Sequence, residues 1–460
     1  MARAMRLAAL LMLAALLMAS CGRGAAPVPA DTEPPSEVQR ADTEPPSEVP
    51  LAEPEPAGEA DSPFAALMEQ ETEDEMAMIT PRELAERVKG QDPDAVYLFA
   101  VNVGKGDALI LKVGTHACLI DAGKPWAMGS VSRALDCMGV GALGAGLDAV
   151  FVTHTDDDHT GGLEWLAAKA LPVDGWYASG RFIDVKESKH PAVVAAEARG
   201  QSVGWLERGD AVTLGDTGAV LKVLAPASLF EDKDDNNSLV MMLQSGQGRM
   251  LLTGDMELPE EAELMAQGDD LSCAVLKVAN HGDDDTTGAD FALAAGAQIA
   301  LISTDSAQKI GTPDPGVVSR LARAGSRVVV TQDSGLGILV TLKAGVATAE
   351  YVSLGEDAAG DVYIAGVDAG DDRIALVNRG EGPAALEGCY LYSDRGDELF
   401  AFPAGTTLAP GATLTVGTLS TEGDCDLLWN DKKVVHRKKT DVISLYDSWG
   451  RLLDCMDNGL

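Results

Sequence analysis

The sequence has few basic side chains, few aromatic rings and few histidines for its 460 residues. Lysine and arginine number 35 against 72 aspartates and glutamates, which gives a formal net charge of −37. This excess of negative charge repels polyanions at long range and argues against a broad electrostatic groove for nucleic acid. Aromatic residues make up 5% of the chain while glycines number 49, a composition that favours a loop-rich α/β protein.

Cysteines are scarce as well, and no two of the seven have the spacing of a zinc knuckle. After residue 21 the sequence also lacks any apolar run long enough to cross a bilayer. These absences argue against a cysteine-rich zinc module and against membrane-spanning helices in residues 22–460.

The N-terminus carries one short apolar run, residues 7–18, behind Arg3 and Arg6. Its length of about twelve residues is too short for a membrane span, and a basic start before such a run is typical of a secretory signal. The run leads into Ala19-Ser20-Cys21, which resembles the lipobox of bacterial lipoproteins. The resemblance implies a signal peptide over 1–20, lipidation of Cys21, and an anchor on the extracytoplasmic face of the cell membrane.

Residues 21–78 form an acidic region that is rich in proline. Within it, the segment 30–38 recurs unchanged as 41–49. Proline stiffens such a segment, and repeated acidic side chains extend it by mutual repulsion. We expect an extended tether that holds the folded part away from the membrane.

Residues 79–355 alternate between strand-like and helical patterns. Thr80-Pro81 followed by Glu83 predicts a helix start, with threonine as N-cap and proline at the first helical position. Adjacent strand-like runs, such as 108–113 and 117–120, are mixed with helices and favour an α/β sandwich over a simple parallel sheet. Residues 360–460 instead hold short apolar runs between Gly and Pro turns, which predict an all-β domain.

One strand-like run leads directly into a loop that is rich in metal-ligand side chains. After 150–153 come His154, Asp156, Asp158 and His159, followed by a pair of glycines. Only six histidines occur in the chain, and two fall within these six residues. An acidic turn with incidental histidines is the alternative. However, two imidazoles and several carboxylates on one loop can point at two adjacent cations, so we interpret the loop as a metal site.

Two later strand ends extend this set. The run 251–253 leads into Gly254-Asp255, and the run 276–279 leads through Asn280 into His281. Each pattern is weak by itself, because an aspartate at a strand end is often a helix cap. Following the first motif in this order, they predict further ligands for the same site.

The order of these motifs resembles the metallo-β-lactamase superfamily, and within it the ComEC-type hydrolase domains of competence proteins. Asp156 is a ComEC-type feature, because most relatives have histidine at that position. The resemblance covers roughly residues 95–345. It implies an αββα sandwich that holds two divalent metal ions, zinc or manganese. Further matching segments are 103–107, 109–110, 119–123, 236–240 and 332–335.

The resemblance also implies the metal ligands. Metal one would be held by His154, Asp156 and a bridging Asp255. Metal two would be held by four side chains, Asp158, His159, Asp255 and His281. The ligand that relatives take from a third motif falls near Asp235 or Asn236, which we also treat as candidate substrate contacts. Three carboxylates among six ligands permit manganese as well as zinc.

The chain departs from the family pattern at four positions. Asn102 and Lys105 stand where relatives have aspartate and glutamine, and Asn280 replaces the first histidine of a His-His-Gly. Thr312 stands where such domains carry a histidine before proline, thought to touch the scissile phosphate, so it is a candidate substrate contact. The six principal ligand positions remain filled, which favours an active but diverged hydrolase.

The implied mechanism uses a hydroxide that bridges the two cations. The cations lower the pKa of its parent water, and the hydroxide attacks phosphorus in line while the metals bear the developing charge. Asp158 is the candidate to orient this nucleophile. Lys277 is the candidate to offset charge on a phosphodiester oxygen, with a lysine that extends to the surface as the alternative.

The C-terminal region resembles the lamin-tail domain, an immunoglobulin-like β-sandwich, over about residues 362–456. Cys389 or Tyr390 stands where that family usually has tryptophan. The resemblance implies a binding or positioning role for 360–460. It rests on the order of four segments, 374–380, 386–391, 402–411 and 445–450.

A cluster of five basic side chains stands out in this acidic protein: Lys432, Lys433, Arg437, Lys438 and Lys439. One interpretation is a contact surface for DNA, teichoic acid or anionic lipid. The alternative is a solvated hairpin edge, because lysines protect edge strands from pairing with other chains.

The sequence therefore predicts an exported, lipid-anchored, metal-dependent hydrolase, with phosphodiesterase or nuclease activity as the leading hypothesis. DNA or another anionic phosphodiester polymer is the expected partner. Two further hypotheses remain open. The same metal site could act on a wall-polymer phosphodiester or a lactam-like carbonyl, or the chain could be a catalytically silent lipoprotein that binds the envelope.

Overall fold

The computed structural model describes residues 76–460 except 90–91, 93, 142–144, 184, 355–360, 449 and 451. The predicted signal peptide 1–20, Cys21 and nearly all of the predicted tether 21–78 lie outside the described residues. Within the described ranges, no helix is both long enough and apolar enough to cross a membrane.

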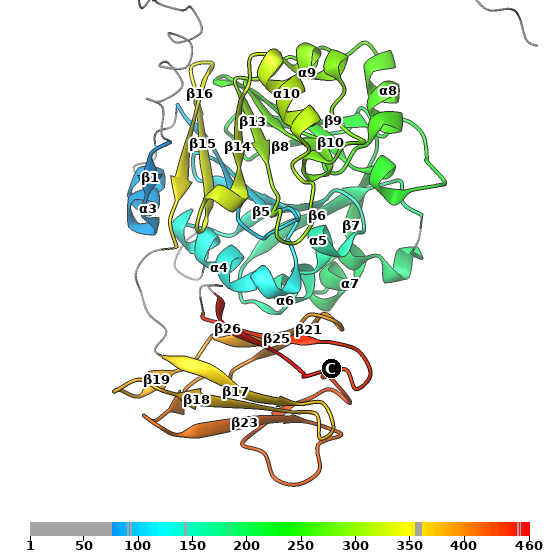
Figure 1. Cartoon of the computed structure of the whole chain (residues 1–460). Coiled ribbons are helices and arrows are strands. Elements are labelled where there is room, and N and C mark those ends of the chain that lie inside the picture. The colour runs from blue at the N-terminus through cyan, green and yellow to red at the C-terminus, as the bar shows by residue number, and fades with distance from the viewer. Residues whose placement is uncertain are drawn as a thin grey trace, which may run out of the picture. The chain divides into compact units, whose positions relative to one another are not determined.

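Two β-sheets form the centre of the N-terminal part (Figure 1). The first has nine strands, in the order β1 (Met78–Ile79), β16 (Val346–Val352), β15 (Gly337–Lys343), β2 (Val96–Val101), β3 (Leu109–Val113), β4 (His116–Ile120), β5 (Leu147–Val152), β6 (Val173–Ser179) and β7 (Val203–Leu206). The second has seven, in the order β14 (Arg327–Val330), β13 (Ile299–Ile302), β12 (Val275–Lys277), β11 (Gly248–Leu252), β10 (Val240–Ser245), β9 (Val220–Ala225) and β8 (Ala211–Thr213).

A buried apolar layer joins the two sheets face to face. Leu98 and Phe151 from the first sheet belong to the same core cluster as Leu252 and Ile299 from the second. None of these four side chains is more than 4% exposed. Packing the inner faces together removes their apolar surface from water, which is the main force that holds such a sandwich together.

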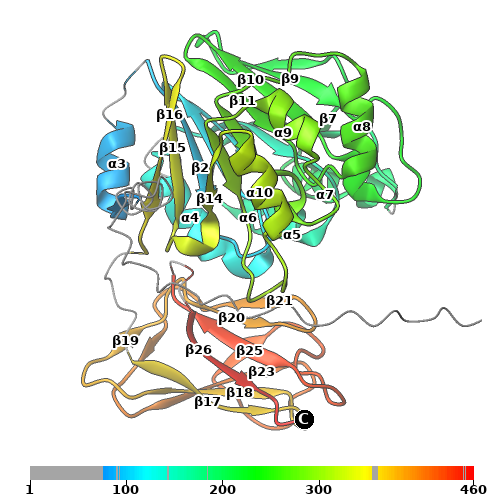
Figure 2. The ribbon, with the colours of Figure 1, turned by 45° about the horizontal axis from the view of Figure 1, so that its top comes forward.

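Helices cover the outer face of each sheet. The first sheet packs against α3 (Pro81–Lys89), α4 (Met128–Cys137), α6 (Leu163–Ala168) and α7 (Pro191–Ala198). The second packs against α8 (Leu258–Ala266), α9 (Ala289–Ala295) and α10 (Pro315–Arg323), which lie together in Figures 1 and 2. The predicted αββα sandwich is therefore confirmed.

Helix α3 begins as its sequence predicts. The Glu83 backbone N–H donates to Thr80 Oγ1 at 3.2 Å, and the Thr80 backbone N–H donates to the Glu83 carboxylate at 2.7 Å. This reciprocal pair satisfies backbone donors that the first helical turn leaves free.

Parallel strands position the site residues at one edge of the sandwich. Strands β4 to β7 run parallel in the first sheet, and β11 to β14 run parallel in the second. The carboxyl ends of parallel strands meet at the same sheet edge. Asp121 follows β4, His154 follows β5, Asp255 follows β11 and His281 follows β12.

The C-terminal part is all-β, as predicted. One four-stranded sheet has the order β17 (Val362–Asp368), β18 (Arg373–Asn378), β23 (Thr413–Thr418) and β24 (Leu427–Trp429). The other has the order β21 (Glu398–Ala401), β20 (Tyr390–Ser393), β25 (Val442–Tyr446) and β26 (Leu452–Asp457). A two-stranded sheet pairs β19 (Ala384–Ala385) with β22 (Thr407–Leu408). Buried side chains from both larger sheets form one core between two layers, which Figure 1 shows one above the other.

Candidate metal centre

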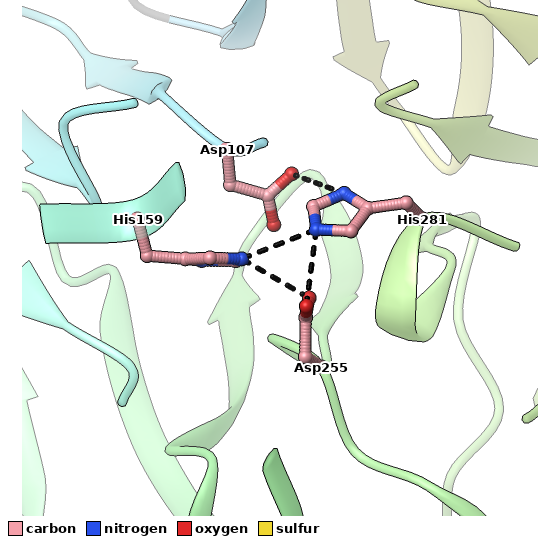
Figure 3. A group of neighbouring side chains, drawn as sticks. All are labelled: Asp107, His159, Asp255 and His281. Atoms are coloured by element: carbon pink, nitrogen blue, oxygen red, sulfur yellow. Dashed lines mark hydrogen bonds and ion pairs between the residues drawn. The ribbon is translucent and has the colours of Figure 1, made fainter. Parts of the chain in front are cut away.

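Four buried side chains from four separate segments of the chain converge at the sheet edge (Figure 3). Asp107, His159, Asp255 and His281 each offer one ligand atom, and these four atoms lie within 4.8 Å of one another. His159 Nε2 lies 3.2 Å from Asp255 Oδ1, and His281 Nε2 lies 3.0 Å from Asp255 Oδ2. Imidazole nitrogens and carboxylate oxygens at this spacing suit a divalent cation.

A second group of ligand atoms is formed by His154, Asp156 and Asp235. His154 Nε2 lies 3.9 Å from Asp235 Oδ1 and 4.0 Å from Asp255 Oδ2. Asp255 therefore borders both groups, which is the position a bridging carboxylate requires. Of the two third-motif candidates, Asp235 reaches the site. Asn236 instead donates to Glu257 at 2.9 Å and accepts from the Glu260 backbone N–H at 3.3 Å.

Three buried atoms of these groups have unused hydrogen-bonding capacity. Asp107 Oδ1, His154 Nε2 and Asp255 Oδ1 make no hydrogen bond within the described residues. A buried polar atom without a partner is costly and calls for an explanation. Burial alone would raise the pKa of Asp255, but His159 and His281 hold that pKa well below its usual range. Open lone pairs on an ionised carboxylate and an imidazole fit bound metal ions, so the donor set suits the predicted pair of cations.

Hydrogen bonds behind the site orient two of the imidazoles. His159 Nδ1 lies 2.7 Å from Asp121 Oδ2, and the same carboxylate accepts from the Thr153 backbone N–H at 2.8 Å. His281 Nδ1 donates to the Ser303 carbonyl at 2.7 Å. With Nδ1 engaged, Nε2 of each ring points into the cluster, the arrangement that metal-binding histidines commonly use.

The turn that carries His281 is held in an uncommon backbone conformation. Asn280 and His281 have φ values of 41° and 54°, in the left-handed region that non-glycine residues rarely adopt. The Asn280 amide is directed to Glu257 and Asp285, at 3.4 Å from an oxygen of each. The asparagine that replaces a family histidine therefore supports the turn from outside the ligand groups.

Asp158 and Asp107 differ from what the sequence implied. Asp158 Oδ2 lies 3.5 Å from His281 Nε2, but it pairs with the Lys105 ammonium at 2.8 Å. Asp107, which carried no predicted ligand role, occupies the four-residue group instead. The signal for Asp107 was present in the sequence, because Val103-Gly104-Lys105-Gly106-Asp107 follows a strand directly.

Lys277 matches neither sequence interpretation. Its side chain is fully buried, and its ammonium pairs with Asp107 Oδ2 at 2.5 Å. It neither reaches the surface nor faces an open substrate position. The expectation that Lys277 contacts a phosphodiester oxygen is therefore wrong, because its ammonium forms a buried ion pair with Asp107. Lys277 positions Asp107 instead.

Thr312 is also unavailable to a ligand. Only 2% of the residue is exposed, and its hydroxyl contacts Thr304 Oγ1 at 2.9 Å and donates to the Lys309 carbonyl at 3.0 Å. The predicted substrate contact at Thr312 is therefore wrong, because the buried hydroxyl already makes hydrogen bonds to Thr304 and to the Lys309 carbonyl.

The five basic residues of the C-terminal part lie on the loop 430–441, between β24 and β25. All five are exposed, and the loop contains no strand. The hairpin-edge interpretation is therefore wrong. Lys432, Lys433, Arg437, Lys438 and Lys439 project from a loop whose Val434 and Val435 are buried.

Comparisons with known proteins agree with this geometry. Residues 101–320 match the family model of the metallo-beta-lactamase superfamily, and residues 356–458 match that of the Lamin Tail Domain. The chain is similar to ComE operon protein 3 of Bacillus subtilis (strain 168), with 31% identity over 193 residues, 41% of this chain and 24% of that protein. It is similar to competence protein ComA of Neisseria gonorrhoeae, with 25% identity over 236 residues, 51% of this chain and 30% of that protein.

Among solved structures, the metallo-beta-lactamase fold protein YhfI from Bacillus subtilis aligns with 56% of this chain and 99% of its own, at 13% identity and a TM-score of 0.35. The chain spans less than a third of the length of the two curated relatives described above.

Proposed function

The chain carries a ComEC-type hydrolase domain of the metallo-β-lactamase superfamily followed by a lamin tail domain, and we propose that it is an exported, lipid-anchored phosphodiesterase that acts on DNA or a similar anionic polymer. Metal-dependent hydrolysis follows from the family and the buried His/Asp groups. The phosphodiester substrate, the choice of zinc or manganese, and the anchor are the proposed parts.

The residues of the site have separable roles in such a reaction. His154, Asp156 and Asp235 would hold one cation, and Asp107, His159, Asp255 and His281 the other, with Asp255 shared. Bound divalent cations make water a stronger nucleophile at neutral pH and stabilise charge on a phosphoryl oxygen. Asp121 and Ser303 keep the imidazoles oriented, and Asp158 at the edge of the site is placed to accept a hydrogen bond from an attacking water.

A cavity lined by three basic side chains and by Glu207 supports an anionic polymer as substrate. The cavity has a volume of about 380 Å³, and Arg181, Arg208 and Lys222 are among the residues that line it. Arg208 and Lys222 both pair with Asp269, at 2.7 and 3.6 Å. Arg181 Nε is buried without a hydrogen-bond partner in the described part of the chain. A guanidinium with a free N–H in a cavity suits a phosphate group.

The cavity is tied to the metal loop through one aspartate. Asp234 accepts from the Ile183 backbone N–H at 3.0 Å and from the Thr155 hydroxyl at 2.6 Å. Thr155 lies between His154 and Asp156, and Ile183 lies two residues from Arg181. A strand whose scissile phosphate sits at the metals would therefore pass close to Arg181, and this connection is the observation that carries the proposal.

The test is hydrolysis by metal-loaded protein. Purified protein with zinc or manganese is assayed on DNA, RNA and a small chromogenic phosphodiester, with Asp255→Asn as the inactive control. We expect cleavage of all three by the wild type. If a lactam or ester is hydrolysed while every phosphodiester is spared, the carbonyl-hydrolase hypothesis replaces this one. Protein that binds no metal would instead point to a silent envelope-binding lipoprotein.

The anchor is tested separately. Cys21→Ala removes the only side chain in the lipobox-like segment that a lipid can modify, and we expect the variant to remain unprocessed or to be shed into the medium. Cell fractionation distinguishes these results. Processed, membrane-associated Cys21→Ala would contradict the anchor without affecting the proposed chemistry.

A further inference from the structure

We propose that Lys105 binds the phosphoryl group of the substrate and stabilises the charge that builds on its non-bridging oxygens during hydrolysis. The proposal rests on the phosphodiester chemistry proposed above. It assigns to this chain a side chain that contacts the substrate phosphate, a role that the buried Lys277 and Thr312 cannot fill.

Lys105 sits at the tip of a tight turn that is fixed to the metal loop. Gly104 and Gly106 have φ values of 74° and 152°, and a Cβ at Gly106 would lie 2.5 Å from the Asp158 carbonyl oxygen. Beside it, the Asp107 backbone N–H donates to that same carbonyl at 3.0 Å. Only glycine at 106 allows this close approach, so the turn holds the Lys105 backbone at a set position beside Asp158.

Three lysines form ion pairs with site carboxylates in the part of the chain that the structure describes: Lys105, Lys233 and Lys277. Lys277 is fully buried and cannot meet a ligand. Lys233 is shared among three carboxylates, with Asp235 at 3.0 Å, Asp285 at 3.7 Å and Glu257 in contact. Lys105 differs from Lys233 in pairing with a single carboxylate, Asp158 at 2.8 Å, and from Lys277 in having a side chain that is 20% exposed.

The Lys105 ammonium is therefore placed between the ligand carboxylates and the outside. A lysine ammonium is protonated at neutral pH, and it pairs here with a carboxylate at the edge of the site. Asp158 Oδ2 lies 3.5 Å from His281 Nε2, so divalent cations in the ligand groups would repel the Lys105 ammonium that pairs with Asp158. A flexible four-carbon stem allows the ammonium to turn toward an incoming anion without moving the backbone.

The chemical step is simple hydrolysis, and Lys105 takes no proton in it. A bond forms between the water oxygen and phosphorus, the bond from phosphorus to the leaving oxygen breaks, and the leaving oxygen acquires one proton from that water. Negative charge increases on the two non-bridging oxygens as the transition state forms. A positioned ammonium that keeps its three protons stabilises that charge more than it stabilises the ground state.

The test compares Lys105→Gln and Lys105→Arg with a matched control, Lys343→Gln. Lys343 is likewise a lysine paired with one aspartate, Asp92, but its side chain is 51% exposed and it lies on β15, away from the ligand groups. Metal content, calorimetric binding of inorganic phosphate to the metal-loaded protein, and kcat and KM on the small phosphodiester are measured for each variant.

We expect Lys105→Gln to keep its metals, to bind phosphate about tenfold more weakly and to lose about 100-fold in kcat, the scale seen when one charge-stabilising donor is removed. Lys105→Arg should recover part of both, and Lys343→Gln should match the wild type. Unchanged phosphate affinity and kcat in fully loaded Lys105→Gln would overturn the proposal, as would an effect limited to thermal stability.

The two proposals fail in different ways. If the wild type hydrolyses no phosphodiester but phosphate binding still depends on Lys105, the proposed function is wrong and the anion contact stands. If the wild type hydrolyses the ester and Lys105→Gln is equally active, the function stands and the role of Lys105 is wrong.

Discussion

Asp255 in the hydrolase domain and Asp372 in the tail domain are both buried aspartates, with 2% and 1% of their surface exposed. Asp372 has every oxygen occupied: Oδ1 accepts from the Val435 backbone N–H at 2.7 Å, and Oδ2 accepts from the hydroxyls of Thr418 and Ser420 at 2.7 and 3.0 Å. Asp255 keeps Oδ1 free of hydrogen bonds and faces two imidazoles.

This difference separates a structural carboxylate from a ligand. Asp372 accepts hydrogen bonds from the backbone N–H groups of Val434 and Val435 in the loop 430–441. Asp441 does the same from the other end, accepting from the His436 backbone N–H at 2.9 Å. The five basic side chains of this loop are exposed. In the metal centre, the carboxylate lone pairs that accept no hydrogen bond are what allows binding, because a cation is bound by oxygens that are free to coordinate it. Burial alone would not tell the two apart.

The sharpest test of this comparison is removal of the shared ligand. Asp255→Ala should lower the occupancy of both metals together, and we expect loss of several kcal/mol of transition-state stabilisation, about a thousandfold in rate. Elemental analysis and the small-ester assay measure the two effects. Retention of two ions per chain in this variant would contradict the bridging position.

The next largest effect, a loss of folding stability, should come from breaking the buried ion pair between Lys277 and Asp107. Lys277→Met leaves Asp107 without its 2.5 Å partner, and breaking a buried pair from one side costs about 3–5 kcal/mol. Chemical denaturation of the metal-free protein measures this loss. The double variant Lys277→Met/Asp107→Leu is the control, because removal of both charges should restore much of the stability. Wild-type stability in Lys277→Met would show that the pair is unimportant.

Asp372→Ala tests the other side of the comparison. It leaves the buried backbone N–H groups of Val434 and Val435 without acceptors, which we expect to destabilise the tail domain by about 2–3 kcal/mol. Denaturation followed by hydrogen exchange of the loop 430–441 measures the effect. Asp372→Asn, which keeps one acceptor oxygen, should lose less. Metal content should not change, and a fall in metal content would contradict the division of roles.

The smallest effect concerns recruitment by the basic loop. Released counterions make the capture of a polyanion depend steeply on salt. Replacing Lys432, Lys433, Arg437, Lys438 and Lys439 with Ala should flatten that dependence a few-fold. Turnover of the small phosphodiester should remain the same. Equal salt dependence in the variant and the wild type would exclude the loop as a DNA contact.

Much of the fold was predictable because its signals are local. The capping pair at Thr80 and Glu83, the alternation of strands with helices, and the change to an all-β pattern after residue 360 depend on neighbours in sequence. The order of the motifs that carry His154, Asp255 and His281 predicted ligands of one site, and the family resemblance implied how they are shared between two metals.

The sequence by itself determined which side chains were available for the metal centre, since the chain has six histidines and three of them, His154, His159 and His281, lie on segments that follow strand-like runs. Only the tertiary structure decided which of them face inward. Lys277 ends a three-residue strand that is covered on both faces, so alternation along the strand could not show whether its ammonium was buried. Asp107 and Asp235 belong to turns far apart in the chain. Asp107 lies in a glycine-rich segment after a strand and Asp235 falls near the expected third motif, but neither signal showed which ligands it would join. Their proximity to the other ligands exists only because two sheets pack face to face and bring their loops to one edge.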